Sequence, residues 1–197
     1  MSNLFNQSNP FALFKIWYDQ AEKQEPSDPM AMSLATVNAA GQPSVRIVLM
    51  RQYDAEGFSF YTNYLSRKAA DLSANAKAAI NFYWKSTNRQ VRAEGEIVKL
   101  SASESDDYFA SRHSESQLGA WASQQSQNLE SPQLLRDRLE EYRRDFAGKP
   151  IVRPPHWGGY KLVVNQIEFW QGQEHRLHDR ELFIRTDNGW KSRILYP

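Results

Sequence analysis

Short segments rich in β-branched and aromatic residues recur along most of this chain, and turn-forming residues separate them. Residues 38–43 and 53–57 are two such turn signals. Short strands joined in this way are typical of antiparallel sheets and barrels. The segment 78–84 is almost wholly apolar, which indicates a strand that is buried on both faces. We predict strands over residues 30–37, 44–50, 57–61, 78–84, 90–100, 161–171, 176–185 and 190–195.

Capping signals predict helices between these strands. Asn9 and Pro10 precede apolar residues at helical spacing and predict an N-terminal helix over about residues 10–24. Ser101 and Glu104 form a capping-box pattern for a helix that runs to about residue 112. Further helices are expected over residues 66–74 and 133–146. The chain is therefore predicted to be mainly β with peripheral helices, an antiparallel barrel in a single domain of residues 1–197.

Composition excludes several classes of function. Lys and Arg number 24 against 23 Asp and Glu, so the basic excess needed for nonspecific binding to nucleic acid or membranes is missing. The chain has no cysteine, which rules out disulfides, thiolate catalysis and zinc–thiolate sites. The histidines show no metal-ligand spacing, so no metal is expected. Residues 1–9 lack a signal-peptide pattern and no apolar stretch reaches membrane-spanning length, so we expect a cytoplasmic protein.

The segment Arg176-Leu177-His178-Asp179-Arg180 is the strongest indication of function. On a strand, Arg176, His178 and Arg180 project from one face, because side chains alternate. Two guanidiniums and an imidazole on one face suit a small anionic ligand together with proton chemistry. A lone histidine is more often a packed or surface residue, and the two arginines are what favour a functional role here.

Two other segments place cations where an anion could bind. Arg67 and Lys68 fall in the first turn of a predicted helix, where each opposes the helix dipole by about 0.3–1 kcal/mol. A bound anion would reverse that cost, although two solvated surface bases are an equal alternative. Arg46 shares its strand face with Val48 and Met50, so it either pairs with a carboxylate, the commoner case, or meets a ligand.

Tyr108 and Arg112 are four residues apart on a predicted helix, and Ser116 continues the stripe if the helix persists or the chain turns there. A phenol, a guanidinium and a hydroxyl can grip a phosphate, although a Tyr packed on an Arg stem is common. The amide-rich segment 116–126 could bind a heterocycle or a second phosphate, or form a polar loop anchored by Trp121. Gln90 is equally ambiguous, and Trp170 could stack on a ring or fill the core.

Taken together, these segments resemble the pyridoxine (pyridoxamine) 5′-phosphate oxidase family from about residue 29 to residue 190. The resemblance rests on residues 46–51 (RIVLMR), 60–63 (FYTN), 66–69 (SRKA), 89–92 (RQVR), 104–109 (ESDDYF), 111–112 (SR), 116–121 (SQLGAW), 125–126 (QS), 157–160 (WGGY), 167–172 (IEFWQG) and 176–180 (RLHDR). Long motifs in the family's order are far more specific than any one of them.

The resemblance implies an FMN-binding split β-barrel that works as a homodimer, with FMN bound at the subunit interface. It implies oxidation of pyridoxamine 5′-phosphate or pyridoxine 5′-phosphate to pyridoxal 5′-phosphate, with O2 as acceptor and H2O2 as product. The FMN contacts it implies are Arg46, Ile47, Val48, Leu49, Met50, Arg51, Tyr61, Thr62, Arg67, Lys68, Gln90, Gln125, Ser126, Trp170 and Arg180. The substrate contacts it implies are Arg51, Tyr108, Arg112, Ser116, Arg176, Leu177 and His178, with Arg176 and His178 as the catalytic pair.

Some residues depart from the family pattern. Arg51 stands where the family usually has lysine, which keeps the charge but changes the hydrogen-bond geometry. His113-Ser114 replaces a more usual Pro-Arg pair, and a basic segment that commonly precedes the first helix is missing. Two alternatives therefore stay open: a split-barrel flavin reductase with another substrate, and a protein that binds FMN or pyridoxal phosphate without catalysis.

Overall fold

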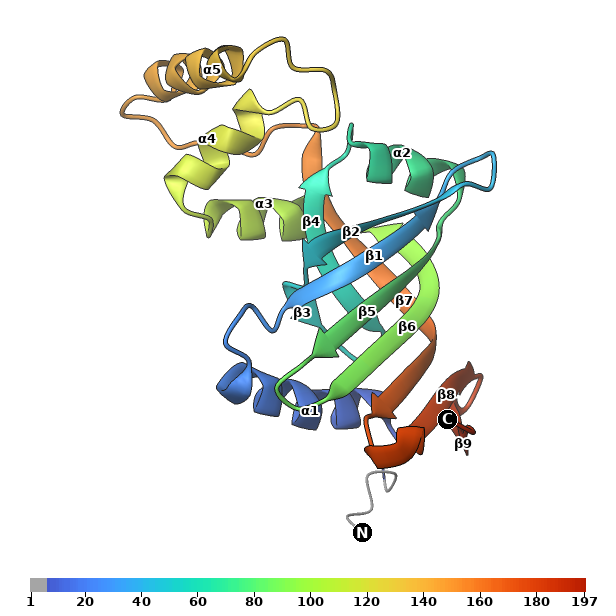
Figure 1. Ribbon diagram of the computed structural model, residues 1–197. Coiled ribbons are helices and arrows are strands. Elements are labelled where there is room, and N and C mark those ends of the chain that lie inside the picture. Colours follow the sequence, from blue (N-terminus) through green and yellow to red (C-terminus); the bar gives the residue numbers. More distant parts are fainter. Residues whose placement is uncertain (1–6) are drawn as a thin grey trace.

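A curled antiparallel sheet forms the body of the molecule, and helices cover its ends (Figure 1). The computed structural model describes residues 7–197. The strands follow the order β2-β1-β5-β6-β7-β4-β3, and β8 pairs with both β7 and β9. The strands are β1 (Ala31–Val37), β2 (Pro43–Leu49), β3 (Gln52–Tyr53), β4 (Gly57–Asn63), β5 (Lys77–Trp84), β6 (Arg89–Lys99), β7 (Trp157–Gln171), β8 (Asp179–Thr186) and β9 (Gly189–Ile194). This arrangement is the split-barrel class that the sequence predicted.

The core lies inside the curled sheet and is closed at one end by α1 (Pro10–Gln24). Phe14 of α1 is fully buried, and its ring meets Phe58 of β4 at 4.8 Å and Phe82 of β5 at 5.3 Å between centroids. The Asn9 side chain accepts a hydrogen bond from the Phe11 N–H and caps the helix. The N-terminal helix and its buried apolar face therefore form where the cap at Asn9 and the apolar spacing predicted them.

β7 spans the molecule and joins its two ends (Figure 1). It pairs with β6, β4 and β8, so it lies at the centre of the sheet for most of its 15 residues. β6 crosses it closely at Gly95, where a Cβ atom would lie 1.9 Å from the Val163 carbonyl oxygen. A register shift falls at Glu94/Gly95, so glycine permits the bend that curls the sheet here.

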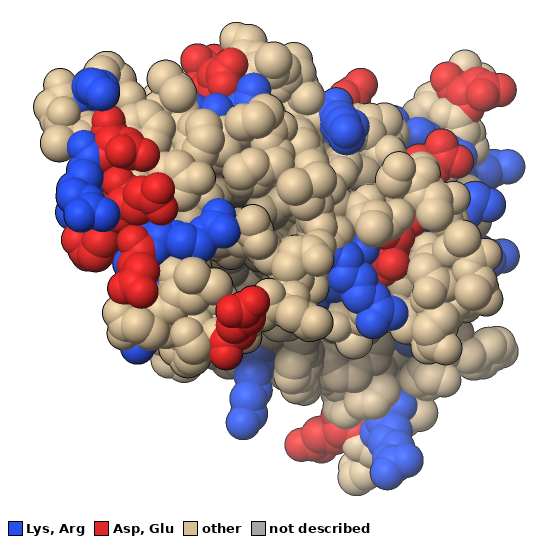
Figure 2. Space-filling view, turned by 90° about the horizontal axis from the view of Figure 1, so that it is seen from above, with Lys and Arg blue, Asp and Glu red and all other residues tan. Residues whose placement is uncertain are grey.

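Four helices gather at the end opposite α1: α2 (Arg67–Ala74), α3 (Ala102–Ala110), α4 (Ser114–Ala122) and α5 (Pro132–Asp145). Among these, α5 has no buried residue, in keeping with its many charges. In Figure 2, which views this end, Lys, Arg, Asp and Glu side chains crowd the left edge, where α5 lies. No helix within residues 7–197 is long and apolar enough to cross a membrane.

The structure differs from the predicted elements at three places: near Arg176, after Arg112 and at β3. The strand expected over 176–185 begins only at Asp179, because residues 174–176 form a short 3₁₀ turn. His175 and Arg176 adopt positive φ angles of 56° and 64°, which no strand allows. The segment after Arg112 is helical as α4, where a polar loop was one interpretation, and β3 was not predicted.

Candidate functional site

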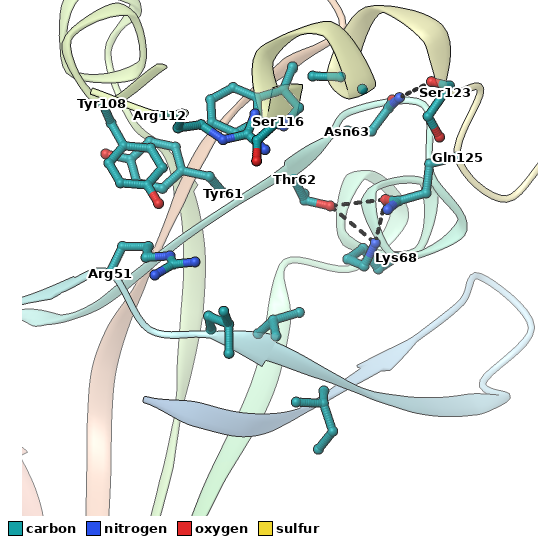
Figure 3. Close-up of a pocket in the computed structure, with 16 residues that line it drawn as sticks. Arg51, Tyr61, Thr62, Asn63, Lys68, Tyr108, Arg112, Ser116, Ser123 and Gln125 are labelled. Carbon is teal, nitrogen blue, oxygen red and sulfur yellow. Dashed lines mark hydrogen bonds between the residues drawn. The ribbon is translucent and has the colours of Figure 1, made fainter. Parts of the chain in front are cut away.

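A cavity of about 460 Å³ opens between β2, β4, α3 and α4 (Figure 3). Polar and charged side chains converge on it from segments far apart in the sequence. The residues that line it are Ile47, Val48, Leu49, Arg51, Tyr61, Thr62, Asn63, Lys68, Tyr108, Arg112, Ser116, Gly119, Ala120, Ser123, Gln125 and Trp157. The cavity therefore contains a large share of the residues that the resemblance implied for the flavin and the substrate.

One end of the cavity is built on stacked aromatic rings. Tyr61 and Tyr108 lie 3.9 Å apart between ring centroids, with their planes 16° from parallel. Trp157 lies nearly parallel to both rings, with its centroid 5.4 Å from that of Tyr61 and 6.2 Å from that of Tyr108. The guanidinium carbon of Arg112 lies over the Trp157 ring, 4.6 Å from its centroid. This end offers flat apolar surface beside a cation.

Arg112 is a half-buried cation that has no counter-ion within residues 7–197. Its Nη1 atom is buried and has no hydrogen-bond partner, and no ion pair to Arg112 forms within the described part of the chain. Burial lowers the pKa of Arg112, and the nearby cation of Arg51 lowers it further. An unpaired guanidinium of this kind is costly unless an anion binds it. The site is therefore prepared for an anionic group.

Tyr108, Arg112 and Ser116 meet at this cavity, as the predicted stripe requires. They do so because α3 ends at Ala110 and α4 begins at Ser114, so that the chain turns between them. The His113 side chain caps α4 by accepting from the Glu115 N–H. A turn, rather than one continuous helix, brings the serine hydroxyl beside the guanidinium.

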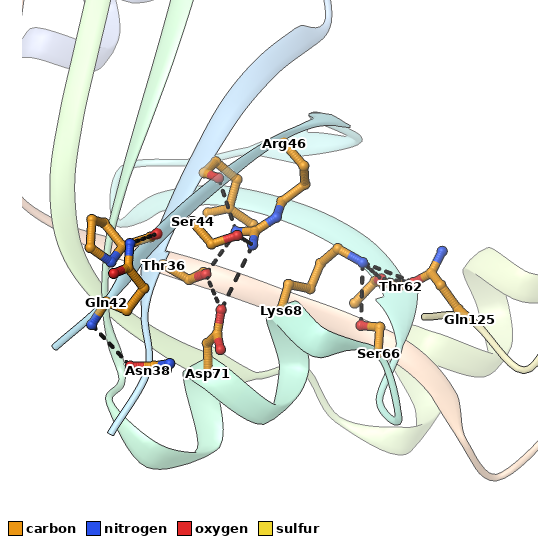
Figure 4. A network of polar contacts seen from close by, with 12 residues as sticks. Thr36, Asn38, Gln42, Ser44, Arg46, Thr62, Ser66, Lys68, Asp71 and Gln125 are labelled. Atoms are coloured by element: carbon orange, nitrogen blue, oxygen red, sulfur yellow. Dashed lines mark hydrogen bonds and ion pairs between the residues drawn. The ribbon is translucent and has the colours of Figure 1, made fainter. Parts of the chain in front are cut away.

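The other end of the cavity is centred on Lys68. Its Nζ atom donates to Gln125 Oε1 at 2.8 Å, Thr62 Oγ1 at 3.1 Å and Ser66 Oγ at 3.2 Å (Figure 4). Burial, with a smaller effect of Arg46, lowers the pKa of Lys68 to about 8. Lys68 has only neutral hydrogen-bond partners here. Its positive charge therefore remains available to an anion at this end as well.

Arg46 is held in a polar network instead of lining the cavity (Figure 4). Its Nη1 atom donates to the Leu34 carbonyl at 3.1 Å and to Thr36 Oγ1 at 2.7 Å. Its Nη2 atom lies 3.7 Å from Oδ2 of the buried Asp71 carboxylate. Of the two interpretations of Arg46, the structure shows the carboxylate pairing.

Several other predicted contacts lie outside the cavity. Met50 is buried in the core, Arg67 is exposed in the first turn of α2, and Ser126 lines a smaller neighbouring pocket. The predicted contacts in the C-terminal third, together with Gln90, which pairs with Trp170, lie at the opposite end of β7, about 40 Å of extended strand from Trp157. We call this group the C-terminal cluster: Gln90, Trp170, Arg176, Leu177, His178 and Arg180.

Within the C-terminal cluster, the common strand face predicted for Arg176, His178 and Arg180 does not exist. Arg176 belongs to the 3₁₀ turn, and His178 precedes β8. The His178 ring packs on Trp170 at 4.6 Å, and its Nδ1 atom accepts from the Gln173 N–H at 3.1 Å. Arg180 donates through Nε to Glu168 Oε1 at 2.8 Å. These side chains gather by packing and pairing, and they do not meet the cavity of the same chain.

Sequence reasoning missed several residues of the cavity. Asn63 donates to the Ser123 carbonyl at 3.3 Å, and this bond joins β4 to the chain after α4. Gly119 and Ala120 of α4 line the wall; they belong to the segment 116–126, which the sequence singled out only as a whole. Trp157 stood in a motif that supported the resemblance but was given no role. No group of three or more His, Asp or Glu side chains within residues 7–197 could hold a metal ion.

Comparison with protein families gives two matches, one after the other along the chain. The model described as pyridoxamine 5′-phosphate oxidase matches residues 18–144. The model described as the pyridoxine 5′-phosphate oxidase C-terminal dimerisation region matches residues 157–197. The chain belongs to the pyridoxamine 5′-phosphate oxidase family. It is therefore a flavin-dependent oxidoreductase by family membership.

Relatives agree over nearly the whole chain. A pyridoxine/pyridoxamine 5′-phosphate oxidase of Paraburkholderia phytofirmans is 51% identical over 191 residues, covering 96% of this chain and 89% of the relative. That of Caulobacter vibrioides is 47% identical over 194 residues, covering 98% and 87%. The crystal structure of PhzG from Burkholderia lata, in complex with tetrahydrophenazine-1-carboxylic acid, has a TM-score of 0.93 at 31% identity and covers 100% of this chain and 97% of that one.

Proposed function

We propose that this protein oxidises pyridoxamine 5′-phosphate or pyridoxine 5′-phosphate to pyridoxal 5′-phosphate, with FMN as cofactor and O2 as electron acceptor. The observation that carries the proposal is the unpaired Arg112 guanidinium, whose Nη1 atom is buried, in the same cavity as the Lys68 cation. Two separated anion sites in one cavity suit two phosphorylated molecules that must lie against each other. The names of the relatives support the same substrates.

The hydrogen-bond donors and the cation that line the cavity fit a flavin nucleotide. Lys68, Thr62 and Gln125 provide a cation, a hydroxyl and an amide at one end. β2 is an edge strand, so main-chain groups of Ile47 to Leu49 are free to hydrogen-bond a flat heterocycle. In this proposal the flavin ring lies along β2 and its phosphate lies near Lys68. When bound, FMN supplies the two-electron chemistry, and the protein supplies binding and orientation.

Arg112, Arg51, Tyr108 and Ser116 then hold the substrate phosphate at the other end of the cavity. Fixing the phosphate fixes the C4′ carbon relative to the flavin, which is a proximity effect. The substrate loses two electrons and two protons, which reduce O2 to H2O2. With the amine substrate, the resulting imine takes up water and releases ammonia. We assign Arg176 and His178 to holding the pyridine ring, with the His178 imidazole as the group that accepts the proton lost from the alcohol or amine.

Arg176 and His178 reach the cavity only if a second copy brings its C-terminal cluster there. We therefore propose a homodimer with FMN at the subunit interface. Val45 and Ile47 on edge strand β2 are 68% and 63% exposed beside the cavity, and a second copy would cover them. The C-terminal match to a dimerisation region supports the same arrangement.

The ligand of the PhzG relative gives a second candidate substrate class. Tetrahydrophenazine-1-carboxylic acid carries a carboxylate on a fused ring system, and that protein is similar over the full length of this chain. The stacked Tyr61, Tyr108 and Trp157 rings would also suit a larger planar acid. The paired cation sites favour the phosphate ester over this candidate.

The test is to purify the protein with FMN and measure O2 uptake and pyridoxal 5′-phosphate formation with each B6 ester. Turnover of either ester supports the proposal. Bound flavin without turnover on both esters contradicts the catalytic half and favours a binding protein. Rapid bleaching of the flavin by a nicotinamide donor would favour a reductase, and turnover of a planar ring carboxylate alone would favour the second candidate.

A further inference from the structure

Three arginines that the resemblance assigns to ligand binding are held in place by different groups. Arg180 is held by the Glu168 carboxylate at 2.8 Å. Arg46 is held by Thr36 Oγ1 at 2.7 Å, in a network that includes Asp71. Arg112 instead lies on the indole ring of Trp157, 4.6 Å from its centroid. Only the last of these arrangements uses no carboxylate.

The difference matters because a carboxylate and an aromatic ring act differently on a guanidinium. A carboxylate cancels its charge and uses its N–H donors. An aromatic face attracts the cation through the ring quadrupole, but it accepts no strong hydrogen bond from the donors, which lie in the guanidinium plane. A guanidinium held by a ring therefore keeps its charge and its donors for a ligand. The partnerless Nη1 atom of Arg112 shows this condition.

We propose that Trp157 is a positioning residue for anion recognition: its indole face fixes the Arg112 guanidinium against the cavity without neutralising it. The inference rests on the proposed function in so far as the anion is the phosphate of a B6 ester. Trp157 lines the same cavity but acts through Arg112, so it is not assigned contact with the reacting atoms.

The surroundings of Trp157 prevent the ring from moving away from Arg112. Trp157 is only 7% exposed and pairs with Asn63 in the β4–β7 ladder. Its carbonyl accepts from Arg153 Nη1 at 2.6 Å, and Arg153 Nε donates to Asp106 of α3 at 2.6 Å. Because α3 leads directly to Arg112, this bridge ties the ring and the guanidinium to a common frame. The Tyr61 ring also packs against the indole, 5.4 Å between centroids and 11° from parallel.

The alternative is that Trp157 only fills space between β7 and α3. A large apolar side chain without an aromatic face would then serve equally well. The two roles separate in a binding experiment on the FMN-loaded protein with pyridoxal 5′-phosphate as the probe, followed by flavin fluorescence or by the absorbance of the probe. This readout does not depend on turnover.

We expect Trp157→Leu to weaken pyridoxal 5′-phosphate binding about tenfold, because a desolvated cation–π contact is lost. Trp157→Phe keeps a smaller ring and should restore most of that loss. Binding of unphosphorylated pyridoxal should not change in either variant. The matched control is Trp190→Leu, which removes a cation–π contact of the same 4.6 Å, to Arg185 on the C-terminal hairpin, and should leave binding of the probe unchanged.

A double-mutant cycle tests whether Trp157 acts through Arg112. In an Arg112→Met background, Trp157→Leu should cause no further loss of affinity. If Trp157→Leu prevents folding or FMN retention, Trp157→Phe repeats the cycle with an expected loss of about threefold, again absent from the Arg112→Met background. Full affinity in Trp157→Leu, or losses that add in the double variant, would overturn the inference.

The outcomes also separate this inference from the proposed function. If the wild-type protein binds pyridoxal 5′-phosphate with the expected dependence on Trp157 but oxidises neither B6 ester, the proposed function fails and the inference stands. If it oxidises the esters and Trp157→Leu binds the probe as tightly as the wild type, the inference alone fails.

Discussion

At the Trp157 end of β7, Arg112 lies on an aromatic ring and keeps its charge, whereas at the Trp170 end Arg180 is paired with Glu168. The first end forms a walled cavity within one chain. The second exposes Arg176 and Leu177 to solvent. Under the proposed function, the first end receives an anion, and the second presents its side chains to the cavity of a second copy.

The largest expected effect would test the first end. Arg112→Met keeps the length of the side chain but removes the charge and the donors. We expect the KM for pyridoxamine 5′-phosphate to rise about 100-fold, because a charged hydrogen-bonded contact contributes about 1.5–3 kcal/mol. Steady-state oxygen uptake measures this, and flavin content should remain at the wild-type level. An unchanged KM would mean that Arg112 is not the phosphate site.

The next effect concerns the second end. Arg176→Ala should slow flavin reduction by pyridoxamine 5′-phosphate about 30-fold while leaving FMN bound, because a charged contact to the substrate ring is lost. Anaerobic stopped-flow absorbance of the flavin follows this step directly. Arg193→Ala, on the neighbouring strand β9, is the control with an equal change of charge. A wild-type reduction rate would remove Arg176 from the mechanism.

The third effect is a pH dependence at the Lys68 end of the cavity. The pKa of Lys68 is lowered to about 8 in the ligand-free protein, so its charge is lost as the pH rises through 8. A bound phosphate favours the charged form and raises that pKa, so FMN binding takes up a proton. FMN affinity should therefore fall about tenfold between pH 7 and pH 9.

Fluorescence titration with FMN, and with riboflavin as the ligand that lacks phosphate, measures this dependence. The riboflavin affinity should stay flat over the same range, and Lys68→Gln should flatten the FMN curve. Equal slopes for the two ligands would place the phosphate away from Lys68.

The smallest expected effect tests the carboxylate pairing of Arg180, which contrasts with the aromatic contact of Arg112. Glu168→Gln removes the buried carboxylate that pairs with both Arg180 and Arg92. Because both arginines are partly exposed to solvent, we expect a loss of only about 1–2 kcal/mol in the free energy of unfolding. Urea unfolding of the FMN-loaded protein measures it. Glu94→Gln, which lies 3.9 Å from Arg92 at the surface, should have almost no effect.

Much of the fold could be predicted because its local signals agree with one another. The cap at Asn9 and the capping box at Ser101 each mark the start of a helix that the structure contains. The apolar segment ending at Trp84 forms a strand as predicted, but it is not buried on both faces, because buried side chains alternate with more exposed ones and Tyr83 is 56% exposed. The strand order could not be read in the same way. The long pairing of β6 with β7 joins residues about 70 positions apart, and no local pattern encodes such a partner.

The candidate site likewise has residues that a local pattern predicted and residues that it did not. Tyr108 lies in the last turn of α3 and Arg112 lies just beyond the end of that helix, so their spacing of four residues was enough to indicate that they lie close together. The strand face expected for Arg176, His178 and Arg180 was wrong because the positive φ angles of His175 and Arg176 cannot be inferred from two residues that tolerate many conformations. Trp157 was missed because a tryptophan is more often core, and only its contact with an unpaired cation distinguishes it.

The continuity of β7 has a consequence for inheritance. β7 carries Trp157 at its start and Trp170 near its end. In the proposed homodimer, the β7 strand of each subunit would therefore contribute to both catalytic centres. A copy defective in Arg112 and a copy defective in Arg176 could then complement each other, because a mixed pair would concentrate both lesions in one centre and leave the other whole. Two alleles that each encode an inactive subunit would then together retain a fraction of the normal enzymatic activity.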